Sequence, residues 1–170
     1  MGGVKGANPR RRAAWVLGGL AAGGVLFAVQ GLFLTVCAVR GTSMEPTLAD
    51  GERVLVWRPG AIARGDLIVF AHPDATDELL VKRVVALEGS TVESRDGHLV
   101  VDGITLDEPW VKQGTALGPL PRVVVPPGRL YLLGDDRAES IDTRVLGTID
   151  RHLVVGVVVC KLWPPGGIGR

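Results

Sequence analysis

A serine stands directly after a long run of apolar residues. Ser43 lies in RGTSMEPTL, residues 40–48, which begins where that run ends. A serine hydroxyl is a weak nucleophile until a base removes its proton, so a catalytic Ser43 requires such a base elsewhere. The three histidines, His72, His98 and His152, stand beside turns or strand ends, where surface or structural histidine is common. Histidine is therefore the weaker candidate for the base.

Lys82 is the stronger candidate because its neighbours are aliphatic. It stands in LLVKRVVAL, residues 79–87, and is one of four lysines in the chain. A strand this apolar is buried, and burial lowers the pKa of a lysine by up to about 3–5 units in the strongest cases. A neutral amine near pH 7 can act as a general base. The alternative is a lysine that points outward from one face of an alternating strand, since lysine is almost never fully buried.

A third segment gathers charge. LGDDRAESIDTR, residues 133–144, holds four acids, two arginines and a serine. Taken alone, it is typical of a solvated loop. Its position after a short apolar run, residues 129–133, also suits a loop that follows a strand.

The long apolar run predicts a transmembrane helix. Residues 13–39 carry no charge, and their clearly polar members are Gln30 and Thr35. As a helix the run would be roughly 40 Å long, more than the hydrocarbon core of about 30 Å. A cleavable signal peptide has a shorter apolar centre, of roughly 7–15 residues, and a buried soluble helix would show polar residues every three or four positions. An anchor helix over 13–39 is the preferred interpretation.

Charge predicts the orientation of this helix. Lys5 and the cluster 10–12 (three arginines) precede the run, and Arg40 follows it. The positive-inside rule then places residues 1–12 in the cytoplasm and residues 40–170 outside, as a single-pass protein of the plasma membrane. The net charge of +1 gives no indication of a nucleic-acid partner. Cys37 and Cys160 have no metal-ligand spacing, and a disulfide between them is not expected.

The part after residue 40 is predicted to be all β. Short runs rich in β-branched and aromatic residues alternate with turn-forming pairs, and Asp96-Gly97 predicts a tight hairpin. We therefore expect a mainly β fold, a folded sheet or barrel, preceded by one transmembrane helix. The predicted strands are Glu52–Trp57, Asp66–Phe70, Leu79–Leu87, Thr91–Arg95, His98–Asp102, Arg122–Val125, Leu130–Leu133 and Leu153–Leu162.

Four segments together resemble a known family. GTSMEPTL (41–48), RGDLIVF (64–70), VKRVVALEGS (81–90) and LLGDDRAESIDTRVLGTI (132–149) look, in this order, like the sequence boxes of type I signal peptidases. These are membrane-bound serine proteases with a Ser/Lys dyad, and the resemblance covers residues 41–164. It implies a signal-peptidase-like β domain behind one anchor helix, with no metal and no other cofactor.

The resemblance also implies roles for individual residues. Ser43 matches the nucleophile, Lys82 the general base, and Ser140 the serine whose hydroxyl orients the lysine. A hydroxyl can do this without charging the amine, whereas a carboxylate would raise its pKa. An ionised acid in this loop should therefore be neutralised by an arginine rather than touch Lys82. The charged residues that match those bracing the family's site are Asp142, Arg144, Arg83 and Asp135.

The chain departs from the family pattern in several places. Some members have a serine, which donates to the oxyanion, where this chain has Gly41. The backbone N–H of Ser43 remains as one donor, and Thr42 is the candidate for a second. Asp136 replaces the usual asparagine and adds negative charge near the lysine. Thr143 replaces a serine in the usual Asp-Ser-Arg.

The implied activity is removal of signal peptides from exported preproteins, by cleavage after small-x-small motifs. The partners would then be signal-peptide-bearing preproteins and the lipid bilayer. Trp57, Trp110 and Trp163 are candidates for contact with lipid headgroups, with core burial as the alternative. The candidates for the substrate pocket, each with core packing as the alternative, are Val39, Met44, Leu48, Leu80 and Val81.

Two other functions remain open at this point. A self-cleaving repressor of related β fold would also use a Ser/Lys pair, but it should carry a DNA-binding domain in place of residues 1–40. A tethered β-module that only binds would need no Ser43, Lys82 and Ser140 together.

Overall fold

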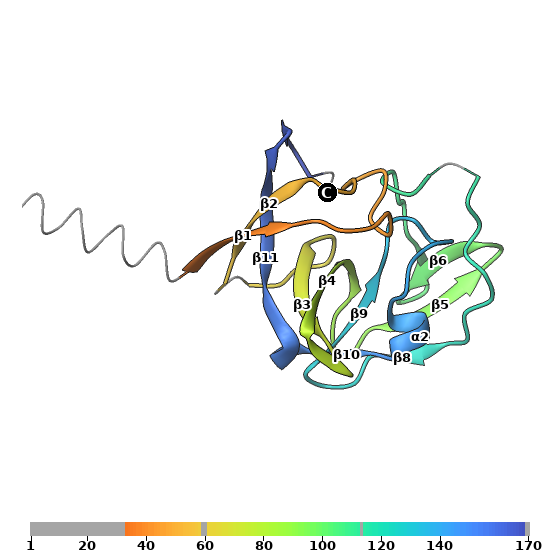
Figure 1. Ribbon diagram of the computed structural model, residues 1–170. Coiled ribbons are helices and arrows are strands. Elements are labelled where there is room, and N and C mark those ends of the chain that lie inside the picture. The colour runs from red at the N-terminus through yellow and green to blue at the C-terminus, as the bar shows by residue number, and fades with distance from the viewer. Residues whose placement is uncertain (1–32, 59–60, 113, 169–170) are drawn as a thin grey trace, which may run out of the picture. The chain divides into compact units, whose positions relative to one another are not determined.

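The computed structural model describes residues 33–58, 61–112 and 114–168 (Figure 1). The chain divides into two units, Met1–Leu34 and Thr35–Arg170, and the fold described here is that of the second. The predicted cytoplasmic segment, 1–12, and residues 13–32 of the predicted anchor lie outside the described residues. Within the described residues, no helix has the length and apolar character to span a bilayer.

The end of the predicted anchor helix is wrong. Residues Leu34–Ala38 form strand β1, which is hydrogen-bonded to strand β2 (Arg53–Trp57). The pairing continues past β1, because the N–H of Val39 donates to the carbonyl of Glu52 at 2.8 Å. A neighbouring strand thus supplies the backbone partners that a helix would have supplied internally. An apolar run alone does not distinguish the two cases.

The unit contains two antiparallel sheets. The larger has the order β1-β2-β11-β3-β4-β9-β10, with β12 paired to β11, and the smaller has the order β7-β6-β5-β8. A short helix, α2 (Thr143–Leu146), and a 3₁₀ turn (Arg151–Leu153) lie between β9 and β11. The remaining strands are β3 (Leu67–His72), β4 (Ala75–Ala86), β5 (Thr91–Arg95), β6 (His98–Val101), β7 (Ile104–Thr105), β8 (Val123–Val124), β9 (Arg129–Leu133), β10 (Ile149–Asp150), β11 (Val154–Trp163) and β12 (Pro165–Gly166).

The central strands are buried on both faces. In β3, Leu67 and Val69 pack into one apolar core, whereas Ile68 and Phe70 pack into a second. Side chains alternate across a strand, so a strand covered on both sides must be apolar at every position. Residues 82–86 of β4 are likewise all buried. This excludes the alternative in which Lys82 points outward from a half-exposed strand.

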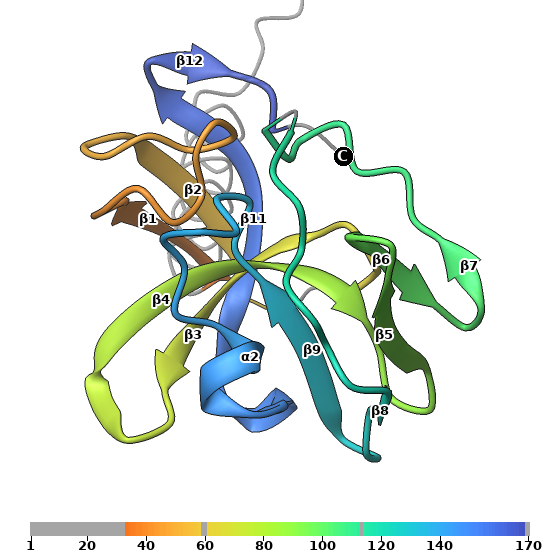
Figure 2. The ribbon, with the colours of Figure 1, turned by 90° about the vertical axis from the view of Figure 1, so that its right-hand side faces the viewer.

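The smaller sheet packs against the end of the larger one. A third core joins residues of β4 and β9, such as Val85 and Tyr131, to residues of β5 and β6, such as Val92 and Leu99. Figure 2 shows β4 crossing the unit toward the smaller sheet with β9 beside it. β4 therefore carries Lys82 and also forms part of the contact between the sheets.

Tight turns connect the strands of the smaller sheet. Asp96 and Gly97 have φ values of 52° and 79°, the left-handed pair that a two-residue hairpin requires. The hairpin predicted at this pair is confirmed, since β5 and β6 flank it. Asp102 and Gly103 repeat the arrangement, with φ values of 55° and 80°, before β7.

The predicted fold class is confirmed as mainly β. Each of the eight predicted strands has an observed counterpart, with the same limits at β5 and limits that differ by up to a few residues at the others, most at β4, which begins at Ala75. The sequence analysis did not identify β1, β7, β10, β12 or the short helix α2. Apart from β1, these elements have two to four residues, too few to show a period.

Gly156→Ala should destabilise the fold. A Cβ at Gly156 would lie 2.5 Å from the carbonyl oxygen of Trp57, on the neighbouring strand β2. The backbone cannot yield easily, so overpacking should lower the free energy of unfolding by about 1–3 kcal/mol. Chemical denaturation measures this difference. Gly118→Ala is the matched control, because no heavy atom lies within 4 Å of its Cβ position; equal losses in the two variants would contradict the packing argument.

Candidate active site

Two buried side chains anchor the loop that carries Ser43 to the apolar core. Met44 and Leu48 are 1% and 0% exposed and lie in the core formed with β2 and β3. The N–H of Leu48 donates to the carbonyl of Met44 at 2.8 Å, which closes a turn between them. Ser43, half-buried, is held at the surface of that core. The structure thus places Met44 and Leu48 in packing roles rather than in the pocket lining for which they were candidates.

Lys82 and Ser43 lie within hydrogen-bonding distance. Lys82 Nζ donates to Ser43 Oγ at 2.7 Å and to the carbonyl of Val81 at 3.0 Å. Lys82 is 3% exposed, so water has almost no access to the amine. Residues 39 positions apart in sequence are therefore joined at the point where a nucleophile and a base would meet.

Burial changes the charge state of this amine. Desolvation lowers the pKa of Lys82 from 10.5 to about 8, although the charges of Asp142 and Asp135 act in the opposite direction. Burial disfavours the ammonium form, whereas nearby carboxylates favour it. A substantial fraction of the amine is therefore neutral near pH 8, and neutral amine is the form that can accept a proton.

Asp142 forms an ion pair with Arg144. Arg144 Nε and Nη2 donate to the two carboxylate oxygens at 2.8 and 2.9 Å, and the N–H of Gly134 donates at 2.9 Å. Burial raises the pKa of Asp142, but these hydrogen bonds and the charge of Arg144 outweigh it, so the pKa is lowered. The carboxylate also caps α2 by accepting from the backbone N–H of Arg144. As expected for an acid in this loop, its partner is an arginine, and it makes no hydrogen bond to Lys82.

Arg83 and Asp135 form a second ion pair. The side chains are 1% and 0% exposed and meet through two hydrogen bonds, of 2.8 and 2.7 Å. Arg83 also donates to the carbonyl of Gly65 at 2.9 Å and to Thr47 Oγ1 at 3.2 Å. Because Arg83 follows Lys82 in the same strand, it points to the opposite face. Arg83 thus joins Asp135 to the loops that carry Gly65 and Thr47.

Gly134 marks the closest approach of the acidic loop to Ser43. A Cβ there would overlap Oγ and Cβ of Ser140 and lie 2.5 Å from the carbonyl oxygen of Ser43. That carbonyl accepts a hydrogen bond from the N–H of Asp136 at 3.1 Å. A side chain at position 134 would thus separate the loop from the serine.

Ser140 lies at this junction but makes no hydrogen bond to the amine. Its Oγ is buried, and it lowers the pKa of Asp142, yet its geometry makes no hydrogen bond in the described residues. The carbonyl of Val81, rather than the Ser140 hydroxyl, fixes the direction of the Lys82 amine here.

Two residues that departed from the family pattern have local structural roles. The carboxylate of Asp136 accepts from the N–H groups of Ala138 and Glu139, so it closes its own turn. Gly41 has φ of +82°, a conformation that favours glycine over serine. Thr42 is exposed next to Ser43.

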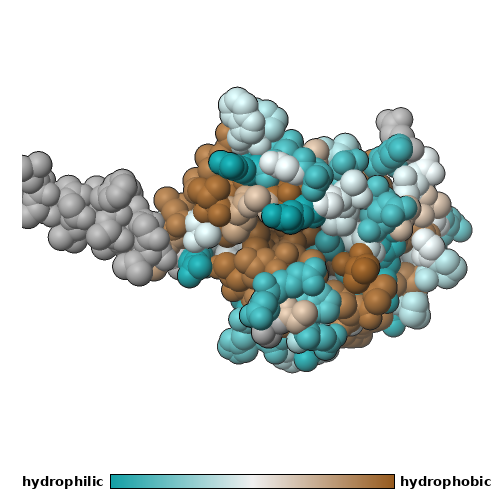
Figure 3. Space-filling view, in the orientation of Figure 1, coloured by the Kyte–Doolittle hydropathy of each residue, from teal (hydrophilic) through white to brown (hydrophobic). Residues whose placement is uncertain are grey.

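A cleft of about 320 Å³ opens beside the two side chains. Its walls come from β1 on one side and from β4 on the other, with an apolar floor, and Figure 3 shows apolar surface beside β1. Three of the candidate pocket residues, Val39, Leu80 and Val81, line it. The other lining residues are Cys37, Ala38, Arg40, Ser43, Val54, Val69, Asp77, Glu78, Leu79 and Lys82.

The sequence analysis missed several residues near the site. Val54 and Val69 line the cleft floor but looked like ordinary strand residues. Arg137 donates from Nε to the carbonyl of Gly134 at 2.9 Å and pairs with Glu108. Arg137 belongs to the acidic segment that resembles the family, and its place in that segment was the available signal. Glu108 offered none.

The three tryptophans named as candidates for lipid contact differ in exposure. Trp57 and Trp163 are 37% and 69% exposed, on β2 and β11. Trp110 instead faces inward, with the Arg83 guanidinium 4.3 Å from its ring centroid. Across the described ranges, no group of three or more His, Cys, Asp and Glu side chains is arranged to hold a metal ion.

Comparisons with known proteins gave consistent matches. The model of the family described as signal peptidase, peptidase S26, matches residues 12–163. Signal peptidase IB of Staphylococcus aureus is 35% identical over 171 residues, which cover 88% of each chain. Signal peptidase I of Bacillus licheniformis is 36% identical over 140 residues, covering 74% of this chain and 75% of its own. The crystal structure of a signal peptidase I from Enterococcus faecalis is similar with a TM-score of 0.53 and 28% identity, covering 59% of this chain and 98% of that one.

Lys82→Met should change how stability depends on pH. Between about pH 8 and 10.5 the unfolded chain binds more protons at Lys82 than the folded chain does, so wild-type stability rises with pH in this window. Methionine cannot titrate. From the low to the high end of this window, the free energy of unfolding of the wild type should therefore rise by roughly 3 kcal/mol relative to that of the variant.

Denaturation of both full-length proteins at several pH values measures this gain. Lys112→Met, at an exposed lysine, is the control. A difference between wild type and Lys82→Met that stays constant with pH would show that the amine is hydrated in the folded protein.

Proposed function

Because this chain belongs to the signal peptidase family, peptidase S26, and is thus a serine peptidase, we propose that Ser43 and Lys82 form the dyad of a membrane-anchored endopeptidase. Its substrates are exported preproteins, from which it removes the signal peptide after a small-x-small motif. The observation that carries the proposal is the 2.7 Å contact between Lys82 Nζ and Ser43 Oγ beside an open cleft.

The reaction follows the Ser/Lys variant of serine-protease chemistry. The neutral amine of Lys82 takes the proton of Ser43 as Oγ attacks the peptide carbonyl. The tetrahedral intermediate then expels the amine of the mature protein, which receives the proton from the Lys82 ammonium, and an acyl-serine remains. The same amine deprotonates a water molecule, whose attack releases the signal peptide as a carboxylate and restores Ser43.

The remaining site residues keep this amine neutral and in place. Arg144 and Arg83 hold the charges of Asp142 and Asp135, the two carboxylates that raise the Lys82 pKa. Ser140 matches the serine that orients the lysine in the family, and we assign it this role in the substrate-bound state. The oxyanion accepts a hydrogen bond from the backbone N–H of Ser43, and Thr42 is the candidate for the second donor.

The cleft suits an extended peptide with small side chains. β1 is an edge strand of the larger sheet. Leu79–Val81 of β4 pair with β3 along one edge, and their other edge faces the cleft. Both walls therefore offer backbone groups to a peptide strand, as in β-strand addition. The branched side chains that line the cleft leave little room for a large substrate side chain, which favours side chains of the size of alanine. These residues are Val39, Val54, Val69, Leu80 and Val81.

The membrane brings the substrate to this cleft. The apolar run that precedes β1 is proposed as a single-pass anchor, with the N-terminus in the cytoplasm and the β unit outside at the plasma membrane. Exposed apolar side chains on β1, β2 and β11, namely Val36, Trp57 and Trp163, support contact with the bilayer surface. The serine then lies close to the depth at which a signal peptide ends.

Ser43→Ala and Lys82→Ala should each abolish cleavage of a preprotein while the protein stays folded. The first removes the nucleophile and the second the base, so either loss stops acyl-enzyme formation. Gel separation of precursor and mature protein measures cleavage, and circular dichroism checks the fold. Ser90→Ala and Lys112→Ala, away from the cleft, are matched controls that should keep wild-type activity. Turnover by either dyad variant would refute the proposed dyad.

The pH profile should report the Lys82 amine. Because the neutral form is active, kcat/KM should rise with pH and reach half its plateau near pH 8. Asp142→Asn removes a charge that raises the Lys82 pKa, so its profile should move to lower pH. Asp74→Asn, at an exposed turn, is the control. A midpoint near 10.5 in the wild type would contradict a desolvated base.

A further inference from the structure

A segment outside the cleft contacts two of the site's arginines. Residues 106–110, here called the strap, follow β7 and run between two cavities of about 480 and 380 Å³. Leu106 and Asp107 line both cavities. Its two inward side chains, Glu108 and Trp110, reach Arg137 and Arg83.

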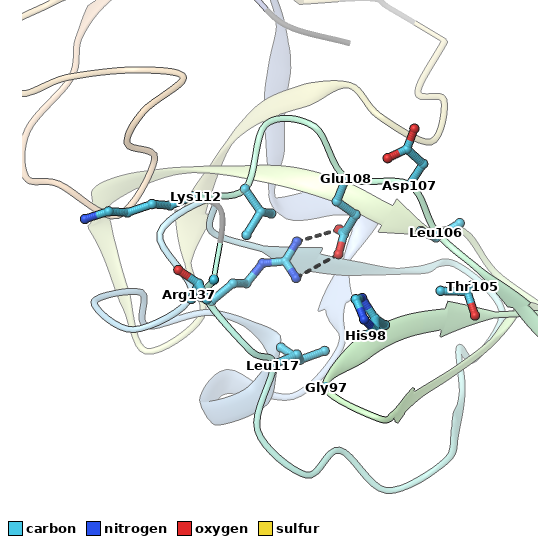
Figure 4. A pocket seen from close by; sticks show the side chains of 12 residues that line it. Gly97, His98, Thr105, Leu106, Asp107, Glu108, Lys112, Leu117 and Arg137 are labelled. Atoms are coloured by element: carbon cyan, nitrogen blue, oxygen red, sulfur yellow. Dashed lines mark hydrogen bonds and ion pairs between the residues drawn. The ribbon is translucent and has the colours of Figure 1, made fainter.

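Glu108 pairs with Arg137. Its carboxylate oxygens accept from Arg137 Nη1 and Nη2 at 3.1 and 2.5 Å, and the two side chains are 12% and 3% exposed. Figure 4 shows the guanidinium and the carboxylate facing each other, joined by two hydrogen bonds, in the lining of the larger cavity. The third nitrogen, Nε, donates to the carbonyl of Gly134. Arg137 thus has one side on the strap and the other on the glycine that lies against Ser43.

Trp110 covers Arg83. Its ring lies 4.3 Å from the guanidinium that binds Asp135. Its indole N–H is buried without a hydrogen-bond partner in the described residues. An unpaired buried donor is unfavourable, so the indole N–H does not explain why the ring lies here. The stacking of the ring on the Arg83 guanidinium does explain it.

We infer that Glu108 and Trp110 are positioning residues for the dyad: through Arg137 and Arg83 they hold the Gly134 loop and the Asp135 ion pair against Ser43 and Lys82. The inference rests on the proposed function. Neither residue lines the cleft, so neither contacts the substrate there. Their loss should therefore slow the chemical step without weakening substrate binding.

The first test separates kcat from KM. In Glu108→Ala, kcat should fall at least about ten-fold with KM within about two-fold of wild type, and Glu108→Gln, which keeps an acceptor, should lose less. Trp110→Ala should behave like Glu108→Ala, and Trp110→Phe, which keeps a ring, should stay near wild type. Asp107→Asn is the matched control, because Asp107 is exposed on the same strap. Unchanged kcat in both alanine variants would overturn the inference.

The charge-swapped double variant Glu108→Arg with Arg137→Glu distinguishes positioning from mere stability. It restores an ion pair, so the melting temperature should recover relative to Glu108→Ala. A glutamate at 137 cannot donate to the carbonyl of Gly134, so kcat should stay low. Recovery of kcat together with stability would overturn the inference.

A readout independent of turnover keeps this test separate from that of the proposed function. NMR titration of Lys82 in the full-length protein should give a pKa nearer 10.5 in Glu108→Ala and Trp110→Ala than in wild type, because a loosened loop admits water to a desolvated amine. A wild-type pKa in both variants overturns the inference even if preproteins are cleaved. The shift supports it even if the true substrate is another peptide.

Discussion

The Lys82 amine is held where water cannot hydrate it, while two carboxylates lie close enough to favour its charged form. Desolvation prevails, and the difference between pKa values of 8 and 10.5 amounts to roughly 3 kcal/mol against the ammonium. This balance depends on Arg83 and Arg144, because each binds one of the two acids directly. An unpaired carboxylate at either place would draw the proton back to the lysine and remove the base.

The alternation of side chains along β4 allows one strand to meet these needs. Lys82 contacts Ser43 and lines the cleft, and Arg83, on the opposite face, binds Asp135, the carbonyl of Gly65 and Thr47 Oγ1. Both faces of β4 are covered, because Val84 packs into one apolar core and Val85 packs into the core shared with the smaller sheet. The same double coverage desolvates the amine.

The sequence predicted those parts of the fold that short-range chemistry determines. The eight longer apolar runs and the Asp96-Gly97 turn became strands and a hairpin, since β-branched side chains and left-handed turn residues act locally. The extent of the anchor was not determined in this way: Leu34–Ala38 are apolar enough for a helix, and pairing with β2 makes them a strand. Met44 and Leu48 show the same limit, because whether an apolar side chain faces a cleft or a core depends on which distant strand lies opposite.

The charges around the dyad show why the motif segments do not describe the site completely. Three arginines, the buried Arg83 and Arg137 and the half-buried Arg144, each have their own acid, but only Asp135 and Asp142 lie in the segments that suggested the family. Glu108 comes from a segment with no recognisable pattern, and without it Arg137 would be a buried cation with no counter-charge. Burying an unpaired charge is costly, so the third arginine requires an acid from elsewhere in the fold. The strap that follows β7 supplies it, and this ties the smaller sheet to the loop that lies against Ser43.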